Sequence, residues 1–142
     1  MKPRLHIGDK NYSSWSMRPW LALKHAGIEF EEVRHELPEM GNGPAAFGAV
    51  SPSGLVPALE LSGGVVIAES LAICEWAAEF SPELWPAGGP GAETRAMARY
   101  ASARMHTGFS ALRRDCPMNI KRRTDALRMT EQGLKDAAEV DA

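Results

Sequence analysis

One short run of residues divides the chain into two parts of different character. The run Trp85-Pro86-Ala87-Gly88-Gly89-Pro90-Gly91 cannot continue a helix, because it is built mostly of proline and glycine. Short apolar segments alternate with helical patterns before it, and only helical patterns follow it. The sequence therefore predicts a mixed α/β domain over residues 1–84, a linker over 85–91 and a helical region over 92–142.

Composition narrows the class of protein. The chain has 142 residues with 44% hydrophobic and 24% charged side chains, which is typical of globular proteins. Its net charge of -2 argues against a nucleic-acid partner. No apolar run is long enough to span a membrane, and the N-terminus lacks a secretory signal. Cys74 and Cys116 are too few for a disulfide framework or a zinc cage, so we expect buried reduced thiols, no metal and a cytoplasmic protein.

The pattern before the linker predicts the element order β-α-β-α-β-β-α. We expect strands at 4–8, 29–37, 56–61 and 65–67, helices at 16–27 and 69–80, and one short irregular helix within 38–53. The first helix is expected to begin near Ser16, with Pro19 tolerated in its first turn, and to end at Gly27. Ser62-Gly63-Gly64 is typical of a hairpin turn between the last two strands.

Two helices are expected after the linker. One long helix is predicted from Glu93 to Cys116, and Pro117 ends it. A second helix is predicted from Thr124, as N-cap, to Ala142, with no stop signal. Two helices bury their apolar stripes poorly on their own. We therefore expect a partial all-helical domain, truncated or completed by another chain.

Three hydroxyls lie at the junction between the first strand and the first helix. Ser13, Ser14 and Ser16 are placed beside the free N–H groups and the positive end of the helix dipole, where an anion is stabilised. The alternative interpretation is that one of these serines caps the helix.

Two further motifs also point to ligand binding. Val56-Pro57 opens a strand, and a cis peptide there would leave the Val56 N–H and C=O free to pair with an extended peptide-like ligand. Glu69-Ser70 opens a helix directly after a strand. Ser70 with the helix N-terminus would bind a carboxylate, and Glu69 would bind an ammonium group. Helix capping and compensation of the helix dipole are the structural alternatives for this pair.

These three motifs, in this order and spacing, resemble those of the glutathione transferases. The resemblance covers residues 4–80 as a thioredoxin-like domain, and residues 92–142 resemble the first helices of the all-helical second domain of that family. Ser13-Ser14-Trp15-Ser16-Met17-Arg18 is similar to the Ser-Ser-Cys-Ser-x-Arg run of the zeta class, which includes maleylacetoacetate isomerases. Trp15 stands where that run has cysteine.

The resemblance implies a role for each matching residue. Ser13 would donate its hydroxyl to the glutathione sulfur, with Ser14 and Ser16 as rivals. The glutathione-binding residues would be Val56, with Pro57 as the cis-proline, and Glu69 with Ser70 at the γ-glutamyl end. A second-substrate pocket would include Trp15, Met105, His106 and Phe109.

The implied function is a glutathione transferase that joins the thiolate of glutathione, its co-substrate, to a small electrophile. Such enzymes are commonly homodimers. Two alternatives stay open, namely a non-catalytic glutathione-binding or structural module of the same fold and a cis–trans isomerase of the maleylacetoacetate type. The serines replace the Cys-x-x-Cys of redox proteins with this fold, so dithiol oxidoreductase chemistry is excluded.

Overall fold

A four-stranded mixed sheet forms the centre of the N-terminal region in the computed structural model, which describes residues 2–36, 47–87, 92–123 and 128–141. Its strands are β1 (Arg4–Ile7), β2 (Glu31–Arg34), β3 (Ala58–Glu60) and β4 (Val66–Ala68), in the order β2-β1-β3-β4. β1 pairs parallel with β2 and antiparallel with β3, and β3 pairs antiparallel with β4. This arrangement confirms the predicted thioredoxin-like fold.

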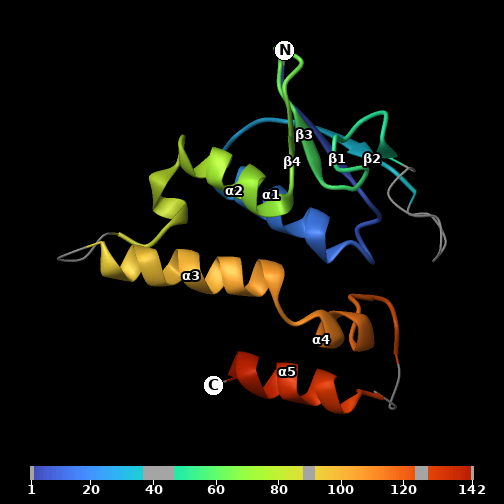
Figure 1. Cartoon of the computed structure of the whole chain (residues 1–142). Coiled ribbons are helices and arrows are strands. Elements are labelled where there is room, and N and C mark those ends of the chain that lie inside the picture. Colours follow the sequence, from blue (N-terminus) through green and yellow to red (C-terminus); the bar gives the residue numbers. More distant parts are fainter. Residues whose placement is uncertain (1, 37–46, 88–91, 124–127, 142) are drawn as a thin grey trace.

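Two helices cover one face of the sheet. They are α1 (Ser14–His25) and α2 (Ser70–Ala78), which also pack against each other (Figure 1). The fully buried core between helices and sheet consists of Leu5, Ile7, Leu23, Leu59, Ile73 and Ala77. Burying a leucine or isoleucine of this kind contributes about 1.5–3 kcal/mol. The sheet and the starts of α1 and α2 are therefore held as one unit.

The first helix begins earlier than its sequence predicts. Ser13 is the N-cap, and its hydroxyl accepts a hydrogen bond from the Ser16 N–H, so α1 starts at Ser14. Pro19 consequently lies inside the helix and not in its first turn. Gly27 adopts a positive φ of 66° just after the helix, as its expected stop requires. The irregular helix expected within 38–53 falls mostly on residues 37–46, outside the described ranges.

The region after the linker contains more breaks than expected. A short 3-10 helix, η2 (Pro82–Leu84), precedes the linker, and the helices α3 (Glu93–Thr107), α4 (Ser110–Asp115) and α5 (Glu131–Asp141) follow it. The single helix predicted from Glu93 to Cys116 is wrong, because Phe109 takes a left-handed φ of 62° after Gly108. The Arg113 guanidinium donates to the carbonyls of Met105 and Gly108 at the end of α3, and so stabilises the break.

Carboxylates on neighbouring elements hold α4 and α5 together. Asp136 of α5 accepts hydrogen bonds from the N–H groups of Ala111 and Leu112, each at 3.1 Å, and so caps α4. Asp115 accepts from the Thr130 N–H and hydroxyl, and Thr130 accepts from the Gly133 N–H at the start of α5. The N-cap is thus Thr130, whereas the predicted N-cap Thr124 lies outside the described residues.

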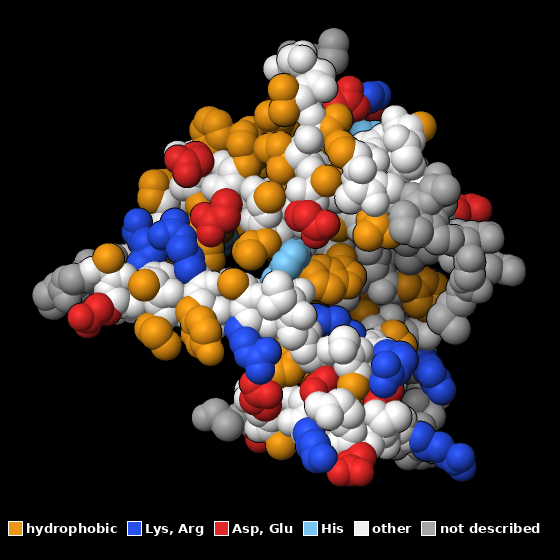
Figure 2. Space-filling model, viewed as in Figure 1, with side chains coloured by type: hydrophobic (Ala, Val, Ile, Leu, Met, Phe, Trp, Pro, Cys, Tyr) orange, Lys and Arg blue, Asp and Glu red, His pale blue; other side chains and the backbone are white. Residues whose placement is uncertain are grey.

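The helices after the linker lie on the side of α1 and α2 that faces away from the sheet (Figure 1). Lysine and arginine side chains gather along these helices in the view of Figure 2, while hydrophobic side chains are exposed nearer the sheet and α2. Within the described ranges, no helix combines the length and apolar character needed to cross a bilayer.

Candidate functional site

Four of the predicted binding residues meet in one pocket. Val56, Pro57, Glu69 and Ser70 line a cavity of about 450 Å³ with Trp15, Ser53, Leu55 and His106; we call it the cis-proline pocket. The end of the loop before β3 supplies one wall, and the start of α2 supplies another. A pocket of this size, with several converging polar groups, suits a small polar ligand.

The backbone of Val56 is available to a ligand. The Val56–Pro57 peptide bond is cis, which confirms the geometry that the resemblance implies. Neither the N–H nor the C=O of Val56 makes a backbone hydrogen bond with another described residue. Buried or half-buried peptide groups normally have a partner, so a bound extended ligand would satisfy both.

Glu69 and Ser70 do not perform the capping that was the structural alternative. The side chain of Glu69 occupies the N-cap position of α2 but makes no capping hydrogen bond, and its backbone has a positive φ of 76° that L-residues rarely adopt. The Ser70 hydroxyl is fully buried and has no hydrogen-bond partner among the described residues. An unsatisfied buried hydroxyl costs about 1–3 kcal/mol. The Glu69 carboxylate instead lies 3.5 Å from His106 Nε2, and the Ser70 hydroxyl is buried at the positive end of α2.

The residues expected around a second substrate do not all lie together. Trp15 and His106 line the cis-proline pocket itself, with their ring centroids 5.3 Å apart and the rings edge to face. Met105 instead lines a separate cavity between α1, α2 and α3, together with Arg18 and Cys74. Phe109 is buried at the break between α3 and α4, where the Arg104 guanidinium lies over its ring. These contacts indicate that Phe109 has a structural role at this break.

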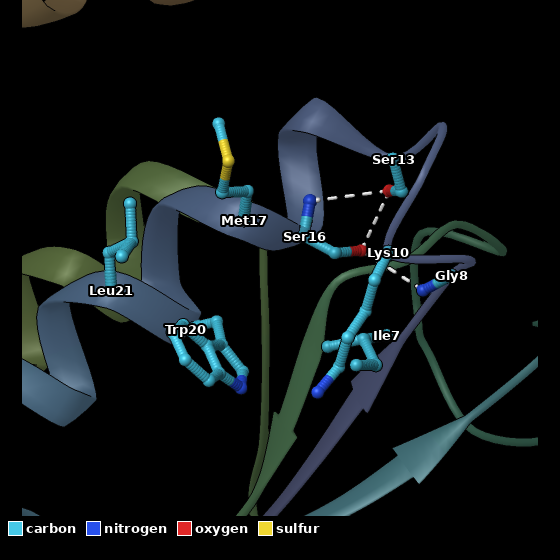
Figure 3. A pocket seen from close by; sticks show the side chains of 8 residues that line it. All are labelled: Ile7, Gly8, Lys10, Ser13, Ser16, Met17, Trp20 and Leu21. Carbon is cyan, nitrogen blue, oxygen red and sulfur yellow. Dashed lines mark hydrogen bonds between the residues drawn. The ribbon is translucent and has the colours of Figure 1, made fainter. Parts of the chain in front are cut away.

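Two of the three candidate serines line another pocket. This serine pocket of about 250 Å³ lies along α1 and is lined by Ser13, Ser16, Ile7, Gly8, Lys10, Met17, Trp20 and Leu21 (Figure 3). The Ser13 hydroxyl donates to Ser16 Oγ at 2.8 Å, and Ser16 Oγ also accepts from the Gly8 N–H at 3.0 Å. Figure 3 shows these bonds joining the start of α1 to the end of β1. Ser13 and Ser16 therefore have structural partners.

Ser14 differs from its two neighbours. It is the first residue of α1, is half-buried, and makes no side-chain hydrogen bond within the described ranges. The sequence alone does not show which of the three serines has a structural partner. Ser16, for example, accepts from the Gly8 N–H, and the fold brings these two residues together.

Sequence reasoning missed a cluster of cationic groups around Trp15. The guanidinium carbons of Arg18 and Arg113 lie 4.4 and 4.8 Å from the centroid of the Trp15 ring. Burial and the neighbouring Arg113 lower the pKa of Arg18, and no ion pair of Arg18 is found among the described residues. Arg18 belongs to the motif at the start of α1, but no sequence signal connects it to Arg113 in the later region.

The two cysteines differ from their prediction in one respect. Both are free, as expected, but Cys74 and Cys116 are half-buried and not fully buried. Burial raises the pKa of the Cys74 thiol to about 11, so this thiol is protonated at neutral pH. The described residues hold no cluster of three metal-ligating side chains.

Fold and site together define a thioredoxin-like protein with a ligand pocket at a cis-proline. Residues 12–79 match the family model for the glutathione S-transferase N-terminal domain. A maleylpyruvate isomerase from Ralstonia sp. is 33% identical over 128 residues, which are 85% of this chain and 55% of that protein. The chain therefore spans about half the length of this curated relative.

Solved structures agree with this match. A glutathione transferase homolog from Burkholderia with bound glutathione has a TM-score of 0.68 and 23% identity, over 98% of this chain and 64% of that one. A sphingomonad glutathione S-transferase complexed with glutathione has a TM-score of 0.59 and 25% identity, over 97% of this chain and 64% of that one. These structures share the fold of this chain, and residues 12–79 match the N-terminal domain of the glutathione S-transferases.

Proposed function

We propose that the chain binds glutathione in the cis-proline pocket and presents its thiolate to a small electrophile. The observation that supports this most directly is the convergence of Val56, Pro57, Glu69 and Ser70 on one cavity. The Ser70 hydroxyl there is buried and has no partner among the residues that the structure describes. Ser70 with the start of α2 suits a carboxylate, and Glu69 suits an ammonium group. A peptide that carries both groups therefore matches this pair of residues.

Each group of the pocket has one proposed contact. The Ser70 hydroxyl and the N-terminal N–H groups of α2 bind the α-carboxylate of the γ-glutamyl residue, and Glu69 binds its ammonium. The N–H and C=O of Val56 pair with the cysteinyl backbone, as one strand pairs with another. We propose that the thiol of a ligand bound in this way reaches the start of α1, which carries the candidate serines.

A serine hydroxyl is proposed to stabilise the thiolate. A free thiol with a pKa near 8.5 is mostly protonated at neutral pH, and a hydroxyl donor near the helix N-terminus favours the ionised form. We propose Ser13 for this role, with Ser14 and Ser16 as rivals. Ser13 would have to exchange its hydrogen bond to Ser16 for one to sulfur, whereas Ser14 needs no such exchange. The thiolate then forms a sulfur–carbon bond with the electrophile, which either releases a leaving group or, at an activated double bond, takes up a proton from water at the neighbouring carbon.

Calorimetric titration with glutathione tests the binding site. The Ser70→Ala variant is expected to bind glutathione at least about tenfold more weakly, because the carboxylate loses a charge-assisted hydrogen bond. Ser62→Ala, in the exposed hairpin turn between β3 and β4, is the matched control and should bind normally. Absence of binding by the wild-type chain, or equal affinities for Ser70→Ala and Ser62→Ala, would refute the proposed site.

Single alanine variants of the three serines test the thiolate role. Ser13→Ala should retain most of the glutathione affinity while the ultraviolet absorbance of bound thiolate disappears. If the absorbance persists in Ser13→Ala and is lost in Ser14→Ala or Ser16→Ala, the role moves to that serine. If it persists in all three variants, no serine stabilises the thiolate.

A second candidate function rests on the Ralstonia relative, which is described as a maleylpyruvate isomerase. In this reading, the thiolate adds to a cis double bond of an unsaturated acid, the adduct rotates, and elimination returns glutathione with a trans product. Assaying a generic aryl halide electrophile and a cis-unsaturated dicarboxylic acid in parallel separates transfer from isomerisation. Glutathione binding with neither activity would favour a binding module without turnover.

We also propose that the chain forms a homodimer, which is common in this family. Sedimentation equilibrium measures the mass directly. A mass of 15.4 kDa at all concentrations would contradict the proposal.

A further inference from the structure

The part of the chain that forms most of the cis-proline pocket contains no lysine or arginine. The sequence has neither residue type between Arg34 and Arg95, while eight glutamates lie in the same interval. Of the residues that line the pocket in the described part of the chain, all except Trp15 and His106 belong to this interval. Most of the pocket wall therefore supplies no guanidinium or ammonium group to a ligand.

Two guanidinium groups lie near the pocket without lining it. Arg18 and Arg113 lie over the Trp15 ring, but Arg18 lines the separate cavity between α1, α2 and α3, and Arg113 donates to backbone carbonyls at the end of α3. Within the described wall, the side chain that can become cationic is that of His106, and its Nε2 lies 3.5 Å from the Glu69 carboxylate. The charged groups of the pocket are thus gathered at the start of α2.

The direction of the proposed ligand follows from the two strands beside the pocket. β3 begins directly after Pro57 and its antiparallel partner β4 ends directly before Glu69, so these two residues come next to each other in the register of the strands. A γ-glutamyl end bound at the start of α2 is then on the Pro57 side of Val56. A ligand that pairs with Val56 continues from there towards Leu55 and Ser53.

This far end of the pocket offers neutral groups. The Ser53 hydroxyl lies 3.0 Å from the Ser51 hydroxyl and accepts from the Leu55 N–H at 3.3 Å, and Leu55 itself is 50% exposed. A carboxylate placed here stays in contact with water and meets no opposite charge from these residues. A hydroxyl or a water molecule can donate to the oxygen of a carboxylate or of an amide alike.

We propose that the pocket selects γ-glutamyl thiol peptides by their amino-terminal half and does not recognise the charge of their terminal carboxylate, which lies beside Leu55. The inference rests on the proposed function and defines its ligand class. A member of this class has a γ-glutamyl residue, a cysteinyl thiol and a C-terminal end that is either charged or neutral. Selectivity then comes from Glu69, Ser70 and the backbone of Val56.

Calorimetric titration of the wild-type chain with glutathione and with its glycyl amide tests the inference. The two ligands differ in the charge of the C-terminal end, so their affinities should agree within about twofold. A larger difference in either direction would overturn the inference, while leaving the proposed glutathione site intact. Failure of the wild-type chain to bind either ligand would instead refute the proposed function itself.

An added cation tests where the terminal carboxylate lies. Leu55→Arg should bind glutathione about threefold more tightly than the amide, because only glutathione carries a carboxylate for the new guanidinium. Val65→Arg is the matched control, since Val65 is 59% exposed directly before β4, at the hairpin end of the strands, and this variant should bind both ligands as the wild type does. Equal affinities for the two ligands in a folded Leu55→Arg variant would overturn the placement beside Leu55. If this variant does not fold, the wild-type comparison decides.

Discussion

The N-terminal α/β region and the later helices are held together by different kinds of interaction. In the described part of the chain, the buried core cluster of six residues lies between Leu5 and Ala77, whereas α3 contains no buried residue and leaves Met97 and Tyr100 largely exposed. Hydrogen bonds to Asp115 and Asp136 connect α4 to α5 and to the residue before it. Apolar burial makes the first region cooperative, while a few polar caps make the second region sensitive to the loss of single acceptors.

The largest expected effect is the loss of a core side chain. Leu59 of β3 is fully buried, so Leu59→Ala should lower the free energy of unfolding by about 2–5 kcal/mol. Met97→Ala on α3 is the matched truncation in the later region, where the side chain is 62% exposed, and it should cost less than about 0.5 kcal/mol. Urea unfolding followed by circular dichroism measures both values. Similar values for the two variants would contradict the contrast between the regions.

A smaller and local effect is expected at the cap of α4. Asp136→Ala removes the acceptor of the Ala111 and Leu112 N–H groups, so exchange of these two amides should accelerate about tenfold, while the amides of β3 keep their rates. Hydrogen exchange followed by NMR resolves the individual amides. The control is Glu139→Ala on the same helix, which breaks only an exposed ion pair with Arg104. Equal acceleration in both variants would assign the effect to α5 as a whole.

The pH dependence of unfolding should also differ between the regions. Burial and neighbouring His6 lower the pKa of His35, whose Nε2 lies 3.0 Å from His6 Nδ1. Because the unfolded chain binds this proton more readily, stability is full above the ordinary histidine pKa of about 6.5 and falls as the pH drops through the lowered value. His35→Gln should flatten the pH dependence of the unfolding free energy between about pH 7 and pH 5.

The later helices should respond at lower pH. Hydrogen bonds from Gln132 and Leu112 lower the pKa of Asp136, and those from Thr130 lower the pKa of Asp115. Their contribution is present above the ordinary aspartate pKa of about 4 and is lost as the pH falls through the lowered values. Exchange rates of the α4 amides, followed from pH 6 to pH 3, locate this second transition. A single transition for both regions near pH 6 would refute the separation.

The smallest expected effect concerns Cys74. Because burial raises the pKa of its thiol to about 11, labelling with a maleimide at pH 7.5 should be at least about a hundredfold slower than that of free cysteine. A Cys116→Ser variant isolates the Cys74 signal, which mass spectrometry quantifies. If Cys74 is labelled as fast as free cysteine, its thiol is not buried. The start of the later helical region would then not cover this part of α2.

The contrast also explains which parts of the fold were predictable. The four strands and the two longer helices before the linker follow local patterns bounded by glycine or proline, such as Gly27 and Pro57. The structure contains all six, although the first helix begins earlier, at Ser14. The break at Gly108-Phe109 was not predictable, because the apolar stripe continues across it and the contacts that stabilise it come from Arg113 further along the chain. The start of α5 depends on Asp115, which is distant from Thr130 in the sequence.

The candidate site divides in the same way. The motifs at Val56-Pro57 and Glu69-Ser70 were visible because strand ends and helix starts place them, and the pocket brings them together. The pairing of Glu69 with His106 joins the start of α2 to α3, and such a contact depends on how the two regions pack. Sequence patterns therefore identified four residues that line the pocket but did not show which charge would face His106.

One contact between the regions has a consequence for the loop that carries the serines. The buried Asn11 donates to Asn119 Oδ1 and accepts from the Lys121 N–H, while its carbonyl accepts from the Ile120 N–H. This single amide anchors the segment after α4 to the residues just before Ser13. Loosening the later helices would therefore leave the sheet intact and free the serine loop. If a serine of this loop has the proposed role, the chain would lose that role before it lost its fold.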